Sequence, residues 1–261
     1  MHPHLIDLGP LSLSTYGAFV AAGYLLGILW LKTQLPFMKE IDEGKFWTMI
    51  YGLFFGAVAG GKLLFLFVER RAFLSGEMSL VRDFRYGFVF FGGMLGAAAM
   101  GFLVRWWIAA PYRPNSDFFG VALPMGHAVG RLGCLFAGCC YGKPTGLPWA
   151  VRLGGPGSST PPQLWGVPLH PVQVYESLSC AAIAWFLWAW ALPRAKRGEL
   201  PAGTVWLGYI FLYSAARFAL EFFRGDDRGG AAAGLYPSQW IALLCMAATA
   251  ALMARWRRES R

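Results

Sequence analysis

Residues 46–68 read FWTMIYGLFFGAVAGGKLLFLFV, and this stretch decides the fold class. It carries a single charged side chain, that of Lys62. A helix needs roughly 20 mostly apolar residues to cross about 30 Å of hydrocarbon. The stretch is long enough to do so, and it is therefore predicted to form a membrane-spanning helix.

Six further apolar runs of similar length lie on either side of this stretch. They cover residues 12–31, 87–110, 118–140, 171–192, 203–223 and 237–254. The run at 118–140 is the weakest of the set because it contains Pro124, His127 and Arg131. We expect an all-α, polytopic membrane protein of about seven transmembrane helices, organised as a single domain over residues 1–261.

The composition agrees with this class of protein. Hydrophobic residues make up 56% of the chain and charged residues 14%, whereas a soluble domain carries roughly 25% charged residues. The net charge of +9 does not indicate nucleic-acid binding, because the Lys and Arg residues lie mainly between the apolar runs. Such charges orient helices and attract the anionic headgroups of the bilayer.

The basic residues also predict an orientation. No Lys or Arg precedes the first run, whereas four arginines lie within residues 255–261. The positive-inside rule then favours an N-terminus outside and a C-terminus in the cytoplasm. The loop at 141–170 lies outside in this topology, and its Gly, Pro and Ser content argues against a separate folded domain. The absence of internal repeats does not favour a transporter.

Two of the runs carry charged residues on one helical face. His127, Arg131 and Cys134 are spaced i, i+4 and i+7. A charge at the centre of a membrane helix costs roughly 2.5–3.5 kcal/mol, so Arg131 is expected to have either a partner that locks packing or a function. The glycines of this run permit close approach of a helix or a lipid headgroup; they are Gly126, Gly130, Gly133 and Gly138.

The run at 203–223 also places polar and charged residues on one helical face, and they continue just past its end. They are Tyr213, Arg217, Glu221 and Arg224. Glu221 is placed to pair with Arg217 or with Arg131, and a satisfied interhelical ion pair is the structural alternative to a functional role. The segment HPVQVYES at 170–177 lies at the start of the run at 171–192. Helix capping and ligand binding are equally open interpretations of this segment.

The predicted topology brings five segments to the same outer level of the membrane. Two arginines there, surrounded by glycines, are suited to a phosphate, because the guanidinium fork matches phosphate oxygens and keeps its charge. A phospholipid entering from the bilayer is the natural anion. The five cysteines do not form a disulfide framework, and the spacing of Cys134, Cys139 and Cys140 lacks the usual C-x2-C, so neither a metal nor a cofactor is predicted. Packing is the expected role of these cysteines.

Three motifs resemble those of the prolipoprotein diacylglyceryl transferase family. GRLGCLFAGCCYG at 130–142 is similar to a signature of the type GRxGNxxxGExxG. HPVQVYE at 170–176 resembles HPxQxYE, and YSAARFALEFFR at 213–224 resembles Y-x3-R-F-x2-E-F-x-R. The resemblance covers nearly the whole chain, from TYG at 15–17 to SQW at 238–240.

The resemblance implies a transferase in the bacterial inner membrane. Its substrates would be phosphatidylglycerol and prolipoprotein signal peptides that carry a lipobox cysteine, and its products a thioether and glycerol phosphate. Arg131 and Arg217 would act on the phosphate, with Tyr213 and His127 as further catalytic residues. The remaining expected substrate-binding residues are Tyr16, Gly92, Gly93, Cys134, Gly142, His170, Gln173, Glu176, Glu221 and Arg224.

The chain departs from the family pattern at three positions. Phe91 stands where members commonly carry a histidine that is assigned as the base, and Cys134 and Cys139 replace an asparagine and a glutamate. His127 is the candidate for the missing imidazole, and a buried neutral histidine bonded to a backbone carbonyl is the alternative. A divergent relative acting on another lipid or acceptor and a lipid-binding protein without catalysis are the alternative functions.

Overall fold

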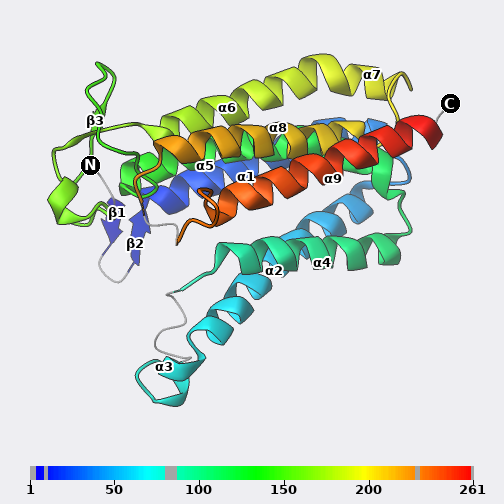
Figure 1. Ribbon diagram of the computed structural model, residues 1–261. Coiled ribbons are helices and arrows are strands. Elements are labelled where there is room, and N and C mark those ends of the chain that lie inside the picture. Colours follow the sequence, from blue (N-terminus) through cyan, green and yellow to red (C-terminus); the bar gives the residue numbers. More distant parts are fainter. Residues whose placement is uncertain (1–3, 9–10, 80–86, 227–229, 260–261) are drawn as a thin grey trace. The chain divides into compact units, whose positions relative to one another are not determined.

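The computed structural model describes residues 4–8, 11–79, 87–226 and 230–259, and these form helices with very little sheet (Figure 1). The long helices are α1 (Thr15–Gln34), α2 (Glu43–Val68), α4 (Phe90–Ile108), α5 (Tyr112–Ala137), α6 (Val172–Phe186), α8 (Thr204–Leu220) and α9 (Pro237–Glu259). The short helices are α3 (Arg70–Leu74) and α7 (Leu192–Lys196). Strand β1 (His4–Leu8) pairs antiparallel with β2 (Leu11–Ser14), and β3 (Val151–Arg152) with β4 (Pro168–Leu169). The predicted all-α class is confirmed.

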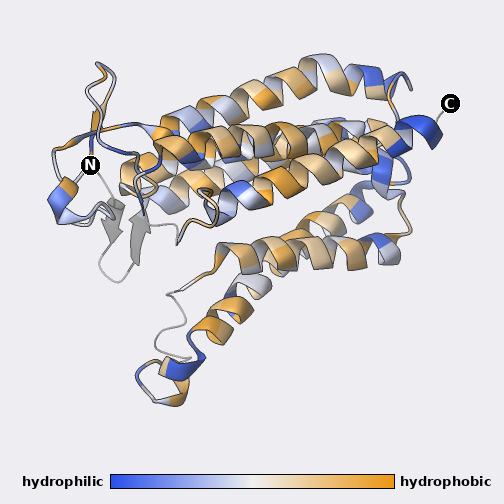
Figure 2. Ribbon diagram, viewed as in Figure 1, coloured by the Kyte–Doolittle hydropathy of each residue, from blue (hydrophilic) through white to orange (hydrophobic). Residues whose placement is uncertain are grey.

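Six helices in the described part of the chain are long and apolar enough to cross a membrane. Figure 2 shows apolar residues along the helices and hydrophilic residues at several of their ends. The run predicted at 203–223 forms α8, which has 17 residues and continues as the 3₁₀ turn Glu221–Phe223. Seventeen residues is the lower end of the lengths that cross a bilayer. The polytopic membrane class is confirmed, and the count of seven stays a prediction.

Local chemistry explains where several helices begin and end. Asp42 caps α2, because its side chain accepts a hydrogen bond from the backbone N–H of Lys45 at 2.8 Å. Helix α5 ends in a Schellman motif: Gly138, with φ +72°, donates to Leu135 O, and Cys139 donates to Cys134 O. The run predicted at 171–192 forms α6, and the helix continues through a π-helical turn at Leu187–Ala191 into α7.

The contacts divide the chain into two compact units, which we describe separately. The first consists of residues Met1–Gln34 and Arg113–Arg261, and the second of Leu35–Tyr112. Within the second unit, α2 packs closely on α4 through glycines. A Cβ at Gly56 would lie 2.6 Å from Gly96 O, and one at Gly60 would lie 2.7 Å from Gly96 Cα. The single domain expected over 1–261 stays a prediction.

Glycines also set the packing inside the first unit. A Cβ at Gly126 on α5 would lie 2.7 Å from Gly23 O on α1, so these two backbones touch. A Cβ at Gly120 on α5 would likewise lie 2.8 Å from Val205 O on α8. The buried Asp117 carboxylate then caps α8, accepting from the N–H groups of Gly203 and Val205 at 2.8 Å each. These contacts fix α1 and α8 against α5, the helix that carries Arg131.

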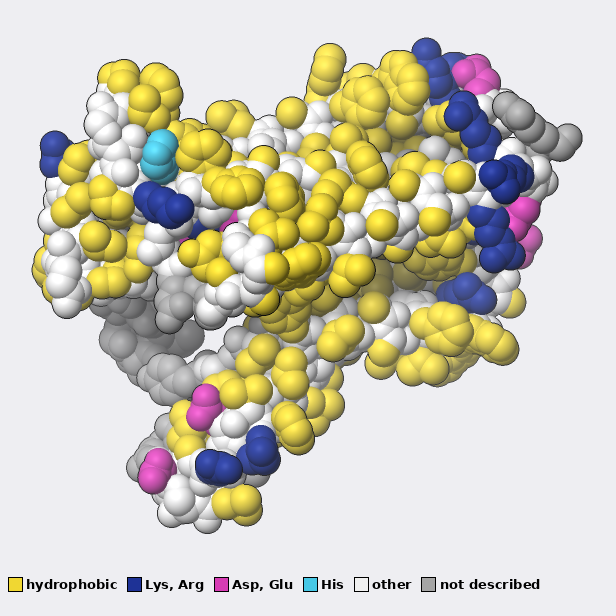
Figure 3. Space-filling view, in the orientation of Figure 1, with side chains coloured by type: hydrophobic (Ala, Val, Ile, Leu, Met, Phe, Trp, Pro, Cys, Tyr) yellow, Lys and Arg dark blue, Asp and Glu magenta, His cyan; other side chains and the backbone are white. Residues whose placement is uncertain are grey.

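Lys and Arg side chains gather at the end of the first unit that carries α7 and the C-terminus of α9 (Figure 3). They include Arg194 and Lys196 in the last turn of α7 and Arg257 and Arg258 in the last turn of α9. This distribution is the one expected for a cytoplasmic C-terminus. The orientation itself stays a prediction.

Candidate active site

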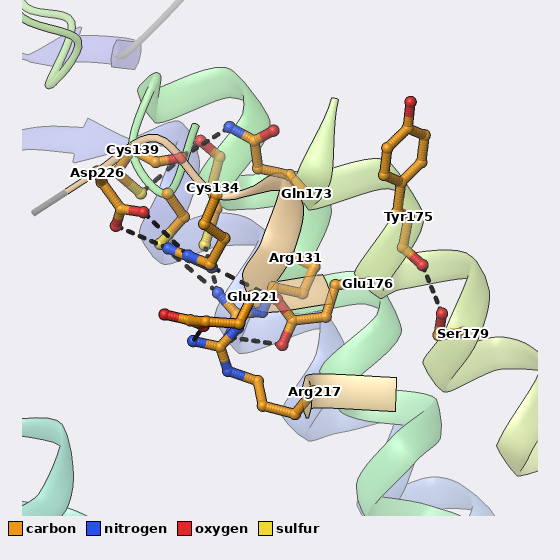
Figure 4. Close-up of polar contacts among 12 residues, drawn as sticks. Arg131, Cys134, Cys139, Gln173, Tyr175, Glu176, Ser179, Arg217, Glu221 and Asp226 are labelled. Atoms are coloured by element: carbon orange, nitrogen blue, oxygen red, sulfur yellow. Dashed lines mark hydrogen bonds and ion pairs between the residues drawn. The ribbon is translucent and has the colours of Figure 1, made fainter. Parts of the chain in front are cut away.

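Glu176 lies at the centre of a buried polar cluster built from α5, α6 and α8 (Figure 4). Its side chain is 1% exposed. Its Oε1 lies 2.9 Å from Arg131 Nη2 and accepts a hydrogen bond from the Tyr213 hydroxyl at 2.9 Å. One carboxylate therefore connects residues from three helices, and it gives Arg131 the partner that an arginine inside a membrane requires.

Arg131 also contacts His127, one helical turn earlier. Arg131 Nε donates to His127 Nε2 at 3.1 Å, and the same nitrogen lies 3.8 Å from Glu176 Oε1. Because Arg131 Nε can only donate, His127 Nε2 is the acceptor in this contact. The partner of His127 is a guanidinium and not the backbone carbonyl considered from the sequence, and its role as a base stays a prediction.

Arg217 and Glu221 form an ion pair along the end of α8, with Nη2 and Oε2 2.6 Å apart. Both side chains are well buried, at 13% and 1% exposure. Among the described residues, Arg217 Nη1 has no hydrogen-bond partner. Of the two partners considered for Glu221, the structure selects Arg217. A buried guanidinium therefore has an N–H group available for a further acceptor.

Arg224 makes the third pair, with an aspartate that the sequence analysis did not select. Its Nε and Nη2 lie 2.9 and 2.7 Å from Asp226 Oδ1 and Oδ2, a bidentate contact. Burial raises the pKa of Asp226, and the charge of Arg224 opposes this shift. Each of the three arginines therefore faces a carboxylate, so neither Arg131 nor Arg217 is a free cation.

The connections at one end of the cluster interlock through their backbones. Gly142 pairs with Arg224, and the Lys143 N–H donates to Phe223 O at 2.8 Å. A Cβ at Gly142 would collide with His170 O, so only glycine fits there. The His170 ring packs on Phe223 with centroids 5.2 Å apart. These residues shape the end of the site, and no charged partner of His170 is seen among the described residues.

Three cysteines lie beside Arg131. The Sγ atoms of Cys134, Cys139 and Cys140 all lie within 4.8 Å of one another. Arg131 Nη1 lies 3.9 Å from Cys134 Sγ and 3.6 Å from Cys140 Sγ. The Cys139 thiol lies 3.7 Å from Cys134 O. Gln173 holds this segment by donating to Cys139 O at 2.7 Å.

Tyr16 and the paired glycines have different surroundings. Tyr16 lies in the first turn of α1 and is 45% exposed, and its backbone lies against Gly133 of α5. Gly92 and Gly93 belong to the second unit, where they pack α4 on α2: a Cβ at Gly92 would collide with Gly60 O, and one at Gly93 would lie 3.2 Å from Ala57 O. The contacts described for these two glycines are helix packing, and their substrate role stays a prediction.

The comparisons with known proteins agree on one family. A family model described as prolipoprotein diacylglyceryl transferase matches residues 3–255. The chain is 31% identical to phosphatidylglycerol–prolipoprotein diacylglyceryl transferase of Clostridium tetani, covering 93% of each chain. It is 29% identical to the enzyme of that name from Cupriavidus pinatubonensis, over 99% of this chain and 93% of the relative. The enzyme of the same name from Burkholderia mallei is 30% identical, over 96% of this chain and 93% of the relative.

Proposed function

Because the chain belongs to the prolipoprotein diacylglyceryl transferase family, it is a diacylglyceryl transferase, and we propose that Arg131 and Arg217 bind the phosphate of its phosphatidylglycerol substrate. The acceptor is the thiol of the lipobox cysteine in a prolipoprotein signal peptide. The protein resides in the bacterial inner membrane, with the site toward the outer leaflet. The resemblance of the three motifs supports this assignment.

One observation carries the proposal for the arginines. Arg217 Nη1 is buried and has no hydrogen-bond partner among the described residues, and Arg131 Nη1 contacts two sulfur atoms at 3.6 and 3.9 Å. A buried N–H group without an acceptor costs about 1–3 kcal/mol. Phosphate oxygens would supply these acceptors in charge-assisted geometry while the carboxylate pairs hold the guanidinium groups in position.

The reaction is a displacement at the glycerol carbon that bears the phosphate. The sulfur of the acceptor cysteine forms the new C–S bond, and the C–O bond to the phosphate breaks with its electron pair leaving on oxygen. Glycerol phosphate departs with this added negative charge. Donors that face the developing charge stabilise the transition state more than the ground state, and this is the role of Arg131 and Arg217.

The thiol must lose its proton during this step, and His127 is the candidate base. Its Nε2 is engaged by Arg131 Nε at 3.1 Å. If phosphate binding weakens the contact between Arg131 Nε and His127 Nε2 while Arg131 Nη2 stays on Glu176, Nε2 becomes free to accept a proton, so phosphate binding and base activation are linked. Tyr213 keeps Glu176 in place through its hydrogen bond of 2.9 Å, and this carboxylate holds Arg131.

The test measures glycerol phosphate released from phosphatidylglycerol by the purified protein in the presence of a lipobox peptide. Arg217→Lys keeps the charge and loses the planar fork, and we expect kcat to fall about 100-fold. Arg131→Lys is expected to fall by a similar factor. Arg255→Lys is the matched control, because Arg255 is 74% exposed near the end of α9, and its activity should not change.

A strain depleted of its own diacylglyceryl transferase also receives Arg131→Ala, Arg217→Ala or His127→Gln. Full growth supported by Arg217→Ala, with the variant present in the membrane, would refute the phosphate role. Full activity of His127→Gln with loss in both arginine variants would remove the base and leave the phosphate site intact.

A further inference from the structure

The three-cysteine cluster of Cys134, Cys139 and Cys140 is not used by the transfer reaction as derived above. Its geometry depends on the end of α5. The Schellman motif at Gly138 turns the chain back, and Cys140 follows with φ +58°. This turn brings the two loop thiols next to Cys134, so that all three Sγ atoms lie within 4.8 Å of one another. Helical spacing alone would not bring them together.

These distances suit a single metal ion. Three sulfur atoms at about 2.3 Å from one Zn²⁺ lie roughly 4 Å apart, so movements of less than about 1 Å close the site. The donor set is made of sulfur alone, and thiolates select soft cations such as Cu(I) and Zn²⁺. Cys134 is buried and the other two cysteines are half-buried, so the site is sheltered but reachable.

The surrounding charges support thiolate ligands. A cation held by three thiolates carries net negative charge, which must be balanced in a buried site. Arg131 Nη1 lies 3.6 Å from Cys140 Sγ and 3.9 Å from Cys134 Sγ. The Arg131 guanidinium is therefore already placed to compensate an anionic metal–thiolate group. Gln173 holds Cys139 through its backbone carbonyl at 2.7 Å.

We propose that Cys134, Cys139 and Cys140 form a binding site for one soft, thiophilic cation of the Cu(I) or Zn²⁺ class. Binding replaces the thiol protons with the metal, so protons are released as the site fills. The site shares Arg131 with the candidate active site but does not depend on the proposed transfer reaction. Cys180 and Cys245 lie on other helices, outside this cluster.

The test uses the full chain, purified in detergent, reduced and freed of reductant without air. Cu(I) alone and Zn²⁺ alone are titrated in separate experiments against a chromophoric chelator. We expect one cation per chain, with proton release. Cys139→Ser should weaken binding about 100-fold, and Cys245→Ser on α9 should leave it unchanged. Circular dichroism checks that each variant is folded, and Cys140→Ser provides a second cluster variant.

Two outcomes would overturn the proposal. The first is that folded Cys139→Ser and Cys140→Ser bind both cations as the unmodified chain does. The second is that the reduced, unmodified chain binds neither cation. Because the titration is done without lipid or peptide, its result is independent of transferase activity.

Discussion

At the scale of single residues, Glu176 connects most of the polar site. Its Oε1 contacts both Arg131 and Tyr213, and its Oε2 lies 3.8 Å from Arg224 Nη1. All of these groups are buried or partly buried, so their interactions are weakly screened by water and salt. A buried carboxylate with cationic neighbours is costly to remove, because its loss leaves buried charge without compensation.

We expect Glu176→Gln to lower the free energy of unfolding by about 3–5 kcal/mol, since the amide keeps the shape but not the charge facing Arg131. The measurement is thermal unfolding in detergent, followed by circular dichroism. Glu199→Gln is the matched control, because Glu199 lies beside Arg197 in an exposed pair, and it should change the midpoint little. An unchanged midpoint for Glu176→Gln would contradict the claim that the Glu176 carboxylate compensates the buried charge of Arg131.

A double variant separates stability from function at the same pair. Replacing both members of a buried ion pair by apolar residues of similar size is often neutral for stability. Arg131→Met combined with Glu176→Met is therefore expected to recover much of the stability that Glu176→Gln loses, while transfer activity stays absent. Recovery of activity as well would show that Arg131 is not required.

At the scale of elements, glycines decide how closely the helices of the first unit approach. Gly126 and Gly130 lie one turn apart on α5 and have opposite surroundings. A Cβ at Gly126 would lie 2.7 Å from Gly23 O on α1, whereas a Cβ at Gly130 would have nothing within 4 Å. The two positions form a matched pair on the helix that carries Arg131.

Gly126→Ala is expected to destabilise the protein by about 1–3 kcal/mol, because α1 must move away from α5. Gly130→Ala should be neutral or stabilising by up to about 1 kcal/mol, since alanine favours the helix and meets no neighbour. Thermal unfolding of both variants checks the pair. Equal midpoints would mean that α1 and α5 do not touch at Gly126. Reduced transfer by a stable Gly130→Ala would indicate that lipid occupies this space.

At the scale of the whole molecule, the distribution of basic residues predicts how the chain crosses the membrane. Arg194, Lys196, Arg257 and Arg258 lie near the ends of α7 and α9, at one end of the first unit. We expect this end to face the cytoplasm. A fluorescent protein that matures only in the cytoplasm should therefore be bright when fused to the C-terminus.

Alkaline phosphatase, which is active only outside the cytoplasm, gives the complementary measurement. Fused after the exposed Gly146 in the loop 141–170, it should be active. A dark C-terminal fusion together with an inactive phosphatase fusion, both present in the membrane, would reverse the orientation and move the candidate site to the inner leaflet.

The sequence by itself determined the membrane class, because an apolar run of about 20 residues is a local property that needs no knowledge of packing. It also grouped residues that share one helix, such as Arg217 with Glu221, since the helical repeat brings i and i+4 together. The three motifs led to the family. The ends of helices were less well predicted, because caps such as that at Gly138 depend on backbone geometry.

The tertiary structure alone decided which residues pair across elements. The partner of Arg131 is Glu176 on another helix, and the partner of Arg224 is Asp226 beyond the helix end. Neither pair follows from a helical repeat, because the rotation of packed helices and the path of the connecting loops determine which side chains meet. The same reason applies to the three cysteine sulfur atoms, which a turn with left-handed backbone angles brings together.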